Sequence, residues 1–214
     1  KSRLAMLALQ LGSPGQARQM CQPQADPIQR TSFIEECSSW YGNLSRLARL
    51  AADVDDGPLR SALAIVVGSV PAAYQSVDDR QVWQEVLSHW YRMQPDKGSH
   101  SAAGWALRQW NLEVPKIFAS KRPLEGRHWC VNSVGVTMLE FPAGNFTGER
   151  ETPRGGTPHE FNVSRAFLLA DRELTRAQFQ QFVDDPEYPS AEKPAKWRGA
   201  DLHNSPTEEH PVQN

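Results

Sequence analysis

The hydrophobic period of this chain changes once, near residues 111–127, and this change constrains the fold more than any other feature. Before it, apolar residues recur at the three- and four-residue spacing of helices, as in residues 44–51. After it, apolar and polar residues alternate as in strands, from residue 129 onward. Prolines and a glycine interrupt the segment between them. We therefore predict a two-domain α+β protein, with an α-helical repeat half at residues 1–112, a linker at 113–127 and a mixed domain at 128–214.

Length and charge exclude several classes of protein. The 214 residues carry 23 basic and 25 acidic side chains, so no net field would attract nucleic acid. No run approaches the roughly 18 apolar residues of a membrane helix. The longest, Ala62–Val67, suits a buried helix. Lys1 already lies inside a helical pattern, so we expect both ends to be internal to a longer protein, and the lack of a secretory leader favours the cytoplasm.

Few side chains suggest metal or thiol chemistry. Cys21, Cys37 and Cys130 are an odd number without paired spacing, which argues against a disulfide framework and favours buried thiols. His89 and His100 fall on different predicted helices without a ligand-spaced neighbour, which argues against a metal site. We assign no catalytic, cofactor-binding or metal-binding residue within the chain.

A loose repeat marks the helical half. Asp26, Asp56 and Asp96 stand four residues before Arg30, Arg60 and His100, respectively. Each Asp can cap the helix that follows it by accepting backbone N–H bonds, and Pro27 and Pro58 suit a first helical turn. The irregular spacing is typical of paired-helix repeats, and this half resembles HEAT-like repeats.

Apolar faces between these caps predict second helices that stack on their neighbours. They comprise Leu44, Leu47, Ala48 and Ala51; Val82, Val86, Leu87 and Trp90; and Trp105, Ala106 and Trp110. A repeat array of this kind is a scaffold or spacer, or it presents a concave face to a protein or peptide ligand. The lack of a recurring charged or aromatic stripe favours the scaffold.

The second half predicts strands and one helix. We expect strands at residues 136–141, 159–163 and 165–170, a hairpin turn at Asn132–Ser133, and a surface loop from Gly148 to Pro158. Pro142–Ala143–Gly144 should end the first strand, and Phe146 should point back into the core.

A helix should follow. Thr175 and Gln178 form a capping box, and the helix should end near Asp185–Pro186. We expect it to bury Ala177, Phe179, Phe182 and Val183. Residues 187–214, rich in proline and charge, should be disordered or loosely packed unless another segment covers them.

Four elements in the second half carry a family resemblance, centred on Gly135–Asp184. They are Pro142–Ala143–Gly144–Asn145–Phe146, Pro158–His159–Glu160–Phe161, Glu173–Leu174–Thr175 with Gln178, Phe179 and Phe182, and His210–Pro211–Val212–Gln213–Asn214. Their order and spacing resemble the opening part of a formylglycine-generating-enzyme domain, also called a sulfatase-modifying-factor domain. One departure is that Gly144–Asn145–Phe146–Thr147–Gly148 lacks the family's usual Met.

The resemblance implies a truncated C-type-lectin-like fold. In active members a cysteine pair binds copper and oxidises a substrate cysteine, and calcium sites accompany it. Both would lie downstream of Asn214, so the resemblance implies that this chain is not catalytic by itself and that Cys130 is not a catalytic residue. It gives His159 a loop-capping role and places His210 and Trp197 near the family's substrate groove.

Helical repeats in front of such a domain resemble the architecture of large bacterial multidomain proteins of planctomycete type. Many of these proteins carry a serine/threonine kinase domain. No kinase motif is present in this chain. We expect a region of such a protein with a non-catalytic sulfatase-modifying-factor-like domain; the alternative is the ligand-binding sensor region of a receptor-like serine/threonine kinase.

Overall fold

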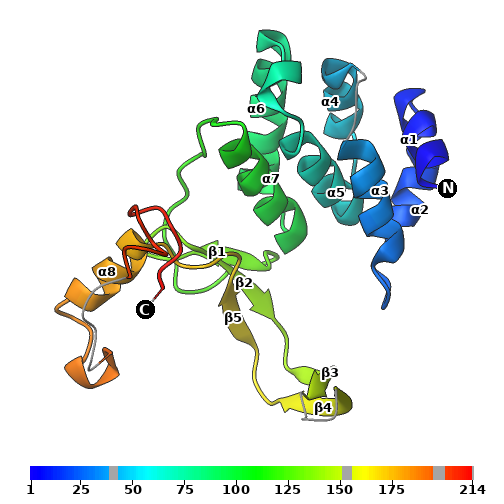
Figure 1. Ribbon diagram of the computed structural model, residues 1–214. Helices are drawn as coiled ribbons and strands as arrows, with labels where there is room; N and C mark the ends of the chain where they lie inside the picture. The colour runs from blue at the N-terminus through cyan, green and yellow to red at the C-terminus, as the bar shows by residue number, and fades with distance from the viewer. Residues whose placement is uncertain (39–42, 151–155, 195–200, 214) are drawn as a thin grey trace. The chain divides into compact units, whose positions relative to one another are not determined.

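Helices fill the first half of the chain, and small antiparallel sheets with one further helix follow (Figure 1). A computed structural model describes residues 1–38, 43–150, 156–194 and 201–213. The predicted α+β composition is confirmed. By their internal contacts the residues form two units, Lys1–Ile117 and Phe118–Asn214, whose border lies inside the predicted linker.

Seven α-helices make up the described part of the first unit. They are α1 (Ser2–Gln10), α2 (Gly15–Cys21), α3 (Ile28–Ser38), α4 (Leu44–Ala52), α5 (Gly57–Gly68), α6 (Val77–Met93) and α7 (Lys97–Gln109), with a 3-10 turn at Ala72–Tyr74. Helices α1, α3, α5 and α7 pack in series, each on the next, and α4 and α6 pack on each other. Helix α1 lies at one end of this stack and α7 at the other (Figure 1).

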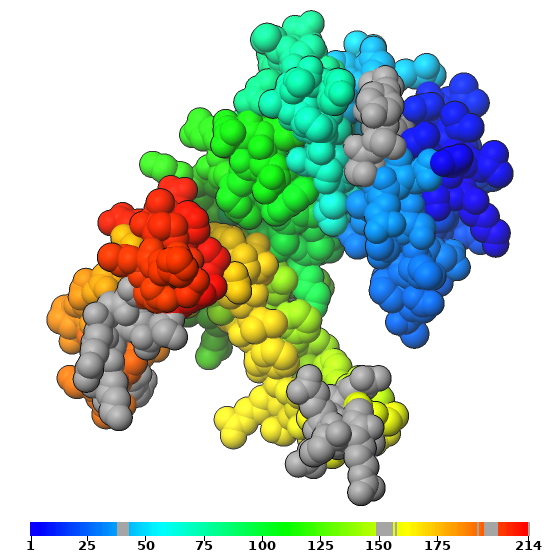
Figure 2. Space-filling model, in the orientation of Figure 1, coloured from blue at the N-terminus to red at the C-terminus, as the bar shows by residue number. Residues whose placement is uncertain are grey.

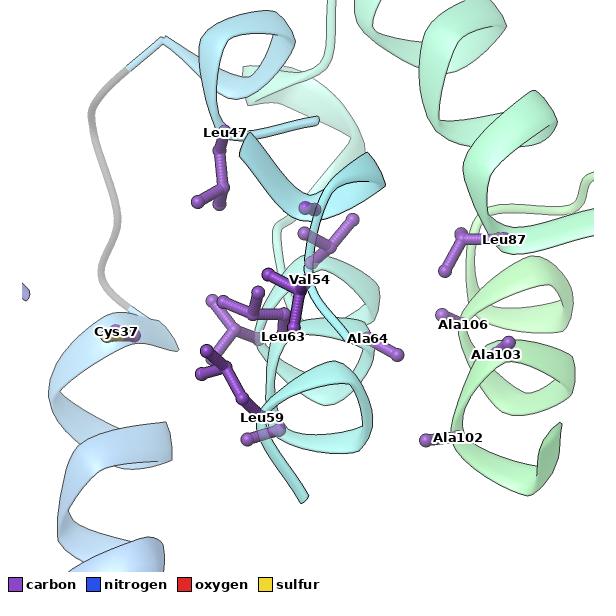
Figure 3. Packing of buried hydrophobic residues seen from close by; sticks show 14 of the residues in the cluster. Cys37, Leu47, Val54, Leu59, Leu63, Ala64, Leu87, Ala102, Ala103 and Ala106 are labelled. Carbon is purple, nitrogen blue, oxygen red and sulfur yellow. The ribbon is translucent and has the colours of Figure 1, made fainter. Parts of the chain in front are cut away.

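Helix α5 occupies the centre of the unit because it is apolar on almost every side. Leu59, Leu63 and Val67 are fully buried in it. Ala64 points toward α7, and Ala102 and Ala106 of α7 point toward α5 (Figure 3). Small side chains on both helices allow this close packing.

The predicted apolar faces of the paired helices enter this core. Leu44, Leu47, Ala48 and Ala51 are all buried, as are Leu87, Trp90, Ala106 and Trp110, while Val82, Val86 and Trp105 pack partly against it.

The segment after α7 belongs to the first unit rather than to a free linker. Leu112, Val114 and Ile117 pack partly against the helical core. Gln84 of α6 donates a hydrogen bond to the carbonyl of Glu113 (2.9 Å), and Arg80 donates to the carbonyl of Trp110 (2.6 Å). These bonds hold the chain against α6 over the first residues of the predicted linker.

The second unit contains a three-stranded and a two-stranded antiparallel sheet. Strands β1 (Trp129–Val131), β2 (Thr137–Phe141) and β5 (Phe167–Ala170) form the first in the order β1-β2-β5, and β3 (Gly144–Arg150) pairs with β4 (Thr157–Val163) in the second. The predicted central strand and hairpin are therefore confirmed. Asn132 closes the hairpin by accepting hydrogen bonds from the amides of Val134 (3.1 Å) and Val136 (2.9 Å), and Gly135 supplies the positive φ of +76°.

Two predictions about the second sheet are wrong. Phe146 does not enter a core: it lies on β3 opposite Phe161 and is 41% exposed. The expected loop at Gly148–Pro158 is shorter, because β3 runs to Arg150 and β4 begins at Thr157. The β3–β4 pairing continues through Gly148, which lies opposite His159, and through Pro158, which lies opposite Glu149. Residues 151–155 of the predicted loop lie outside the described residues.

Helix α8 (Arg176–Asp184) begins with the predicted capping box. Its apolar side chains Ala177, Phe179, Phe182 and Val183 are only half-buried, which corrects the expectation of a buried face. The ring of Phe182 contacts the rings of Phe179 and Tyr188, at 5.7 and 4.7 Å between centroids.

The C-terminal segment is held by hydrogen bonds, which corrects its prediction as loose chain. The amides of Arg176 and Ala177 donate to the carbonyls of His210 (2.9 Å) and Glu208 (3.0 Å). Val212 donates in turn to Leu174 (2.9 Å). Residues 201–213 therefore fold back on the start of α8, where free N–H groups need acceptors.

Candidate functional site

Polar side chains link helices that are not adjacent in the sequence, near the starts of α5 and α7. Asp56 and Asp96 cap these helices by accepting from the amides of Leu59 (2.9 Å) and Ser99 (2.7 Å), as predicted. Asp26 differs: its carboxylate accepts from Ile28, two residues ahead (3.0 Å), in a turn before α3.

Each of the two capping carboxylates also receives a donor from an earlier helix. Asp96 accepts from Arg60 of α5 (3.0 Å), and Asp56 accepts from Gln22 (2.8 Å) with Arg18 of α2 close by (3.5 Å). Each cap thus both starts its own helix and ties it to the stack. We call these links the cap rungs.

Arg60 is the most buried member of the cap rungs. It is 7% exposed, and its guanidinium donates to the carbonyl of Val54 (3.0 Å) and the hydroxyl of Ser99 (3.0 Å) as well as to Asp96. Burial acts to raise the pKa of Asp96, but the Ser99 amide and the Arg60 guanidinium outweigh it and hold that pKa below its ordinary value. The carboxylate is therefore ionised at neutral pH.

A third capping carboxylate, Asp79, links α4 to α6. Asp79 completes the capping box with Ser76 and accepts from the hydroxyl of Ser45 (2.6 Å). Its burial raises the pKa, but the hydrogen bonds from Ser45 and Ser76 prevail and lower it. Asp56, Asp79 and Asp96 thus each cap one helix and accept a hydrogen bond from a residue of another part of the stack.

The histidines of interest lie apart. His100 is fully buried, and its Nδ1 lies 2.6 Å from the carbonyl of Tyr91, on whose ring it stacks at 4.2 Å. His89 is exposed on α6. In the part of the chain that the structure describes, no three or more His, Cys, Asp or Glu side chains group to hold a metal ion.

The three cysteines are buried free thiols. Burial raises the pKa of Cys21 and of Cys37 to about 12, and it also raises the pKa of Cys130 in β1. All three are therefore protonated at neutral pH, whereas nucleophilic attack requires a thiolate.

The residues carried over from the family resemblance do not converge on one described site. His159 lies inside β4, where its ring meets that of Phe161 edge-on at 4.7 Å. His210 is exposed, and its Nδ1 lies 2.7 Å from the hydroxyl of Thr207. Trp197 and Asn214 lie outside the described residues.

A groove of about 250 Å³ lies between the first three helices. Leu4 of α1 and Met20 of α2 provide its apolar surface, and its remaining lining is polar: Lys1, Gln16, Gln19 and Gln29. The sequence predictions missed this groove. The available signal was that α1 is apolar on two sides, in the run from Leu4 to Leu11.

The chain matches no protein-family model, no curated protein and no solved structure. By its fold, the chain is an α+β protein with a helical stack, small antiparallel sheets and a C-terminal helix. In its described part, no helix has the length and apolar character needed to cross a membrane.

Proposed function

We propose that this chain is a non-catalytic scaffold region, in which a HEAT-like helical stack that binds protein or peptide partners is joined to a sulfatase-modifying-factor-like module. The observation that carries the scaffold role is the pair of cap rungs. The buried and half-buried charges of Asp56, Arg60 and Asp96 form hydrogen bonds between helices. These bonds hold the helices of the stack in fixed positions.

A stiff stack of helices suits a partner-binding role. Helices α1, α3, α5 and α7 pack in series, and helices stacked in this way present an extended surface. Extended surfaces of this type bind other proteins or peptides, whereas small-molecule chemistry uses enclosed pockets.

Several features of the second unit support the module assignment. Strand β2, strand β4 and helix α8 with its capping box of Thr175 and Gln178 stand in the order of elements that the resemblance implies. The His210–Gln213 stretch pairs with the start of α8 through the bridge between Thr175 and Pro211.

The non-catalytic role rests on the thiols. Cys21 and Cys37 are fully buried in the helical unit, and Cys130 is 5% exposed in a strand. Buried thiols are closed to a substrate cysteine, which a copper-dependent oxidation would have to reach.

One experiment tests the absence of catalysis. The chain is incubated with copper(I), oxygen and a cysteine-containing sulfatase peptide, and formylglycine is measured by mass spectrometry. We expect none above the background of a Cys130→Ser variant. Turnover that disappears in Cys130→Ser would refute the non-catalytic role.

A second experiment tests the scaffold role. The chain is fused to a biotinylating enzyme in its source cells, and labelled proteins are compared with those of Leu63→Asp, which places a charge in the centre of α5. We expect specific partners that are lost in this variant and retained in Leu124→Asp, whose parent side chain is 61% exposed. An identical set of labelled proteins for all three chains would contradict a scaffold that depends on the folded stack.

A further inference from the structure

The chain that connects the two units is anchored on the helical unit as far as Ile117. After α7, the side chains of Leu112, Val114 and Ile117 pack partly against the helical core. The side chain of Gln84 in α6 donates a hydrogen bond to the carbonyl of Glu113 (2.9 Å). The first residues of the predicted linker are therefore fixed to the first unit.

The chain joins the second unit at Ser120. The Ser120 amide donates a hydrogen bond to the carbonyl of Val131 (2.7 Å), the last residue of β1, so this residue is bonded to the sheet. The Ser120 hydroxyl donates to the carbonyl of Arg122 (2.6 Å) and accepts from the Arg122 amide (3.3 Å), which closes a turn. The part of the predicted linker from Ser120 onward therefore belongs to the second unit.

Two residues, Phe118 and Ala119, lie between these anchors. The Phe118 side chain is 99% exposed, and Ala119 is exposed as well. In the part of the chain that the structure describes, no backbone hydrogen bond involves either residue. These two residues thus lack the contacts that fix the chain on either side of them.

We propose that Phe118 and Ala119 are the hinge between the two units, and that the rest of residues 113–127 moves with one unit or the other. Each residue contributes two soft dihedral angles, φ and ψ, so a hinge of two residues lets the units change their orientation. It does not let them separate, because the chain from Ile117 to Ser120 spans at most about 11 Å when fully extended. A flexible linker over the whole of residues 113–127 would have an average end-to-end distance of about 20 Å.

The helical unit turns on this hinge as one body. Its helices share one hydrophobic core from Ala5 to Trp110, and their side chains pack closely on the face drawn in Figure 2, where this unit is coloured blue to green. A partner that contacts both units therefore selects one orientation of the hinge, and its binding restricts the motion. The hinge follows from the contacts on either side of it and does not depend on the proposed scaffold function.

Distances between one spin label on each unit, measured by double electron–electron resonance, test the hinge. Labels at Asp78→Cys of α6 and Ser133→Cys of the turn between β1 and β2 occupy exposed positions, and the three native thiols are buried. We expect a broad distribution of distances in this labelled chain. Proline at both hinge positions, Phe118→Pro/Ala119→Pro, should narrow the distribution, because proline fixes φ.

Two matched insertions locate the hinge. The sequence Gly-Ser-Gly-Ser, inserted between Phe118 and Ala119, should broaden the distribution by about 10 Å, which is the average length of a flexible chain of this size. The control places the same insertion after Gly126, an exposed residue whose added Cβ would meet nothing within 4 Å. This control lengthens a loop that lies beyond the Ser120 anchor, so the distribution should stay unchanged.

Hydrogen exchange of the unmodified chain tests the anchor without any variant. The Ser120 amide, which is bonded to Val131, should exchange about tenfold more slowly than the amides of Phe118 and Ala119, after correction for their intrinsic rates. Equal exchange of the three amides, equal broadening by the two insertions, or a distribution that neither the hinge insertion nor the proline pair alters would overturn the proposal. Unchanged circular dichroism of each variant shows that the fold is retained.

Discussion

Arg60 places a guanidinium in the interior of the helical unit, where every partner is supplied by the protein. Its contacts reach the carbonyl of Val54, the hydroxyl of Ser99 and the carboxylate of Asp96, each at 3.0 Å. An exposed ion pair loses little when it is broken, because water replaces the partner. A buried one leaves an uncompensated charge and unsatisfied polar groups.

We therefore expect Arg60→Met to destabilise the helical unit by about 3 kcal/mol, within the range for breaking a buried ion pair. Urea denaturation followed by circular dichroism measures the change. Arg3→Met is the matched control: the Arg3 side chain is 81% exposed in its pair with Glu36, so its loss should cost less than about 1 kcal/mol. Equal effects of the two substitutions would show that burial of Arg60 contributes nothing.

The lowered pKa of Asp96 also predicts a pH dependence. The pKa of an unfolded Asp is about 3.9. Because the folded value lies below it, the ionised carboxylate stabilises the fold above that pH, and the contribution is lost as pH falls through the folded pKa. The helical unit should lose stability as the pH is lowered from about 5 toward 3.

The variant Asp96→Asn isolates this contribution. It should be less stable than the wild type at pH 7, and the difference should shrink as the pH is lowered through the acid range, as measured by urea denaturation at each pH. Asp55→Asn is the control, since the Asp55 side chain is 86% exposed. A difference between Asp96→Asn and the wild type that stays constant with pH would contradict the assignment.

At the scale of elements, the contacts of α7 with α5 and with α6 depend on two missing side chains, at Gly68 of α5 and Gly104 of α7. A Cβ at Gly68 would lie 2.9 Å from the Cα of Ala106 and would also collide with the Trp105 ring. A Cβ at Gly104 would lie 2.8 Å from the ring of Tyr91. These distances are shorter than van der Waals contact, so the helices approach as closely as they do because both positions are glycine.

Gly68→Ala should therefore destabilise the unit by about 1–3 kcal/mol, even though alanine is the better helix former by about 1 kcal/mol. The comparison is Gly15→Ala, where a Cβ meets nothing within 4 Å and should be neutral or stabilising. Thermal and urea denaturation measure both. A more stable Gly68→Ala would mean that α7 can shift away without loss of packing.

The local features of these elements could be predicted from the sequence, because each depends on residues close together in the chain. The caps at Asp56 and Asp96, the capping box at Thr175 and the turn at Asn132 each join groups no more than four residues apart. The alternation of apolar and polar residues likewise predicted the strand β2, which lies between β1 and β5 in the sheet.

The cap rungs could not be predicted, since they join residues far apart in sequence. Arg60 and Asp96 are separated by 36 residues, and Gln22 and Asp56 by 34. The recurring Asp, four residues before Arg30, Arg60 or His100, marked the helix starts but did not predict the partner of Arg60. The extended β3–β4 pair was missed because glycine and proline usually interrupt strands, and here cross-strand pairing prevailed over that tendency.

At the scale of the whole molecule, the two units differ in how much apolar surface they bury. The hydrophobic core lies in the helical unit and extends from Ala5 to Trp110. Among the described residues of the second unit, the buried apolar side chains are Trp129, Cys130, Val131 and Val136. Phe146, Phe161, Phe167 and Leu169 are each at least 41% exposed. Because apolar burial is the main source of folding free energy, the helical unit should be much the more stable.

Limited proteolysis of the full chain should therefore remove the second unit first. We expect a resistant fragment that ends near Ile117, since the segment up to that residue packs on the helical core, and rapid cleavage beyond it. Mass spectrometry of the fragments over time identifies the cut sites. In Leu63→Ala, which opens a cavity in α5, the fragment should also be cleaved faster, while cleavage of the second unit should keep its rate. A second unit that outlasts the helical unit would show that its stability comes from something other than apolar burial, and would remove the physical basis for ranking the two.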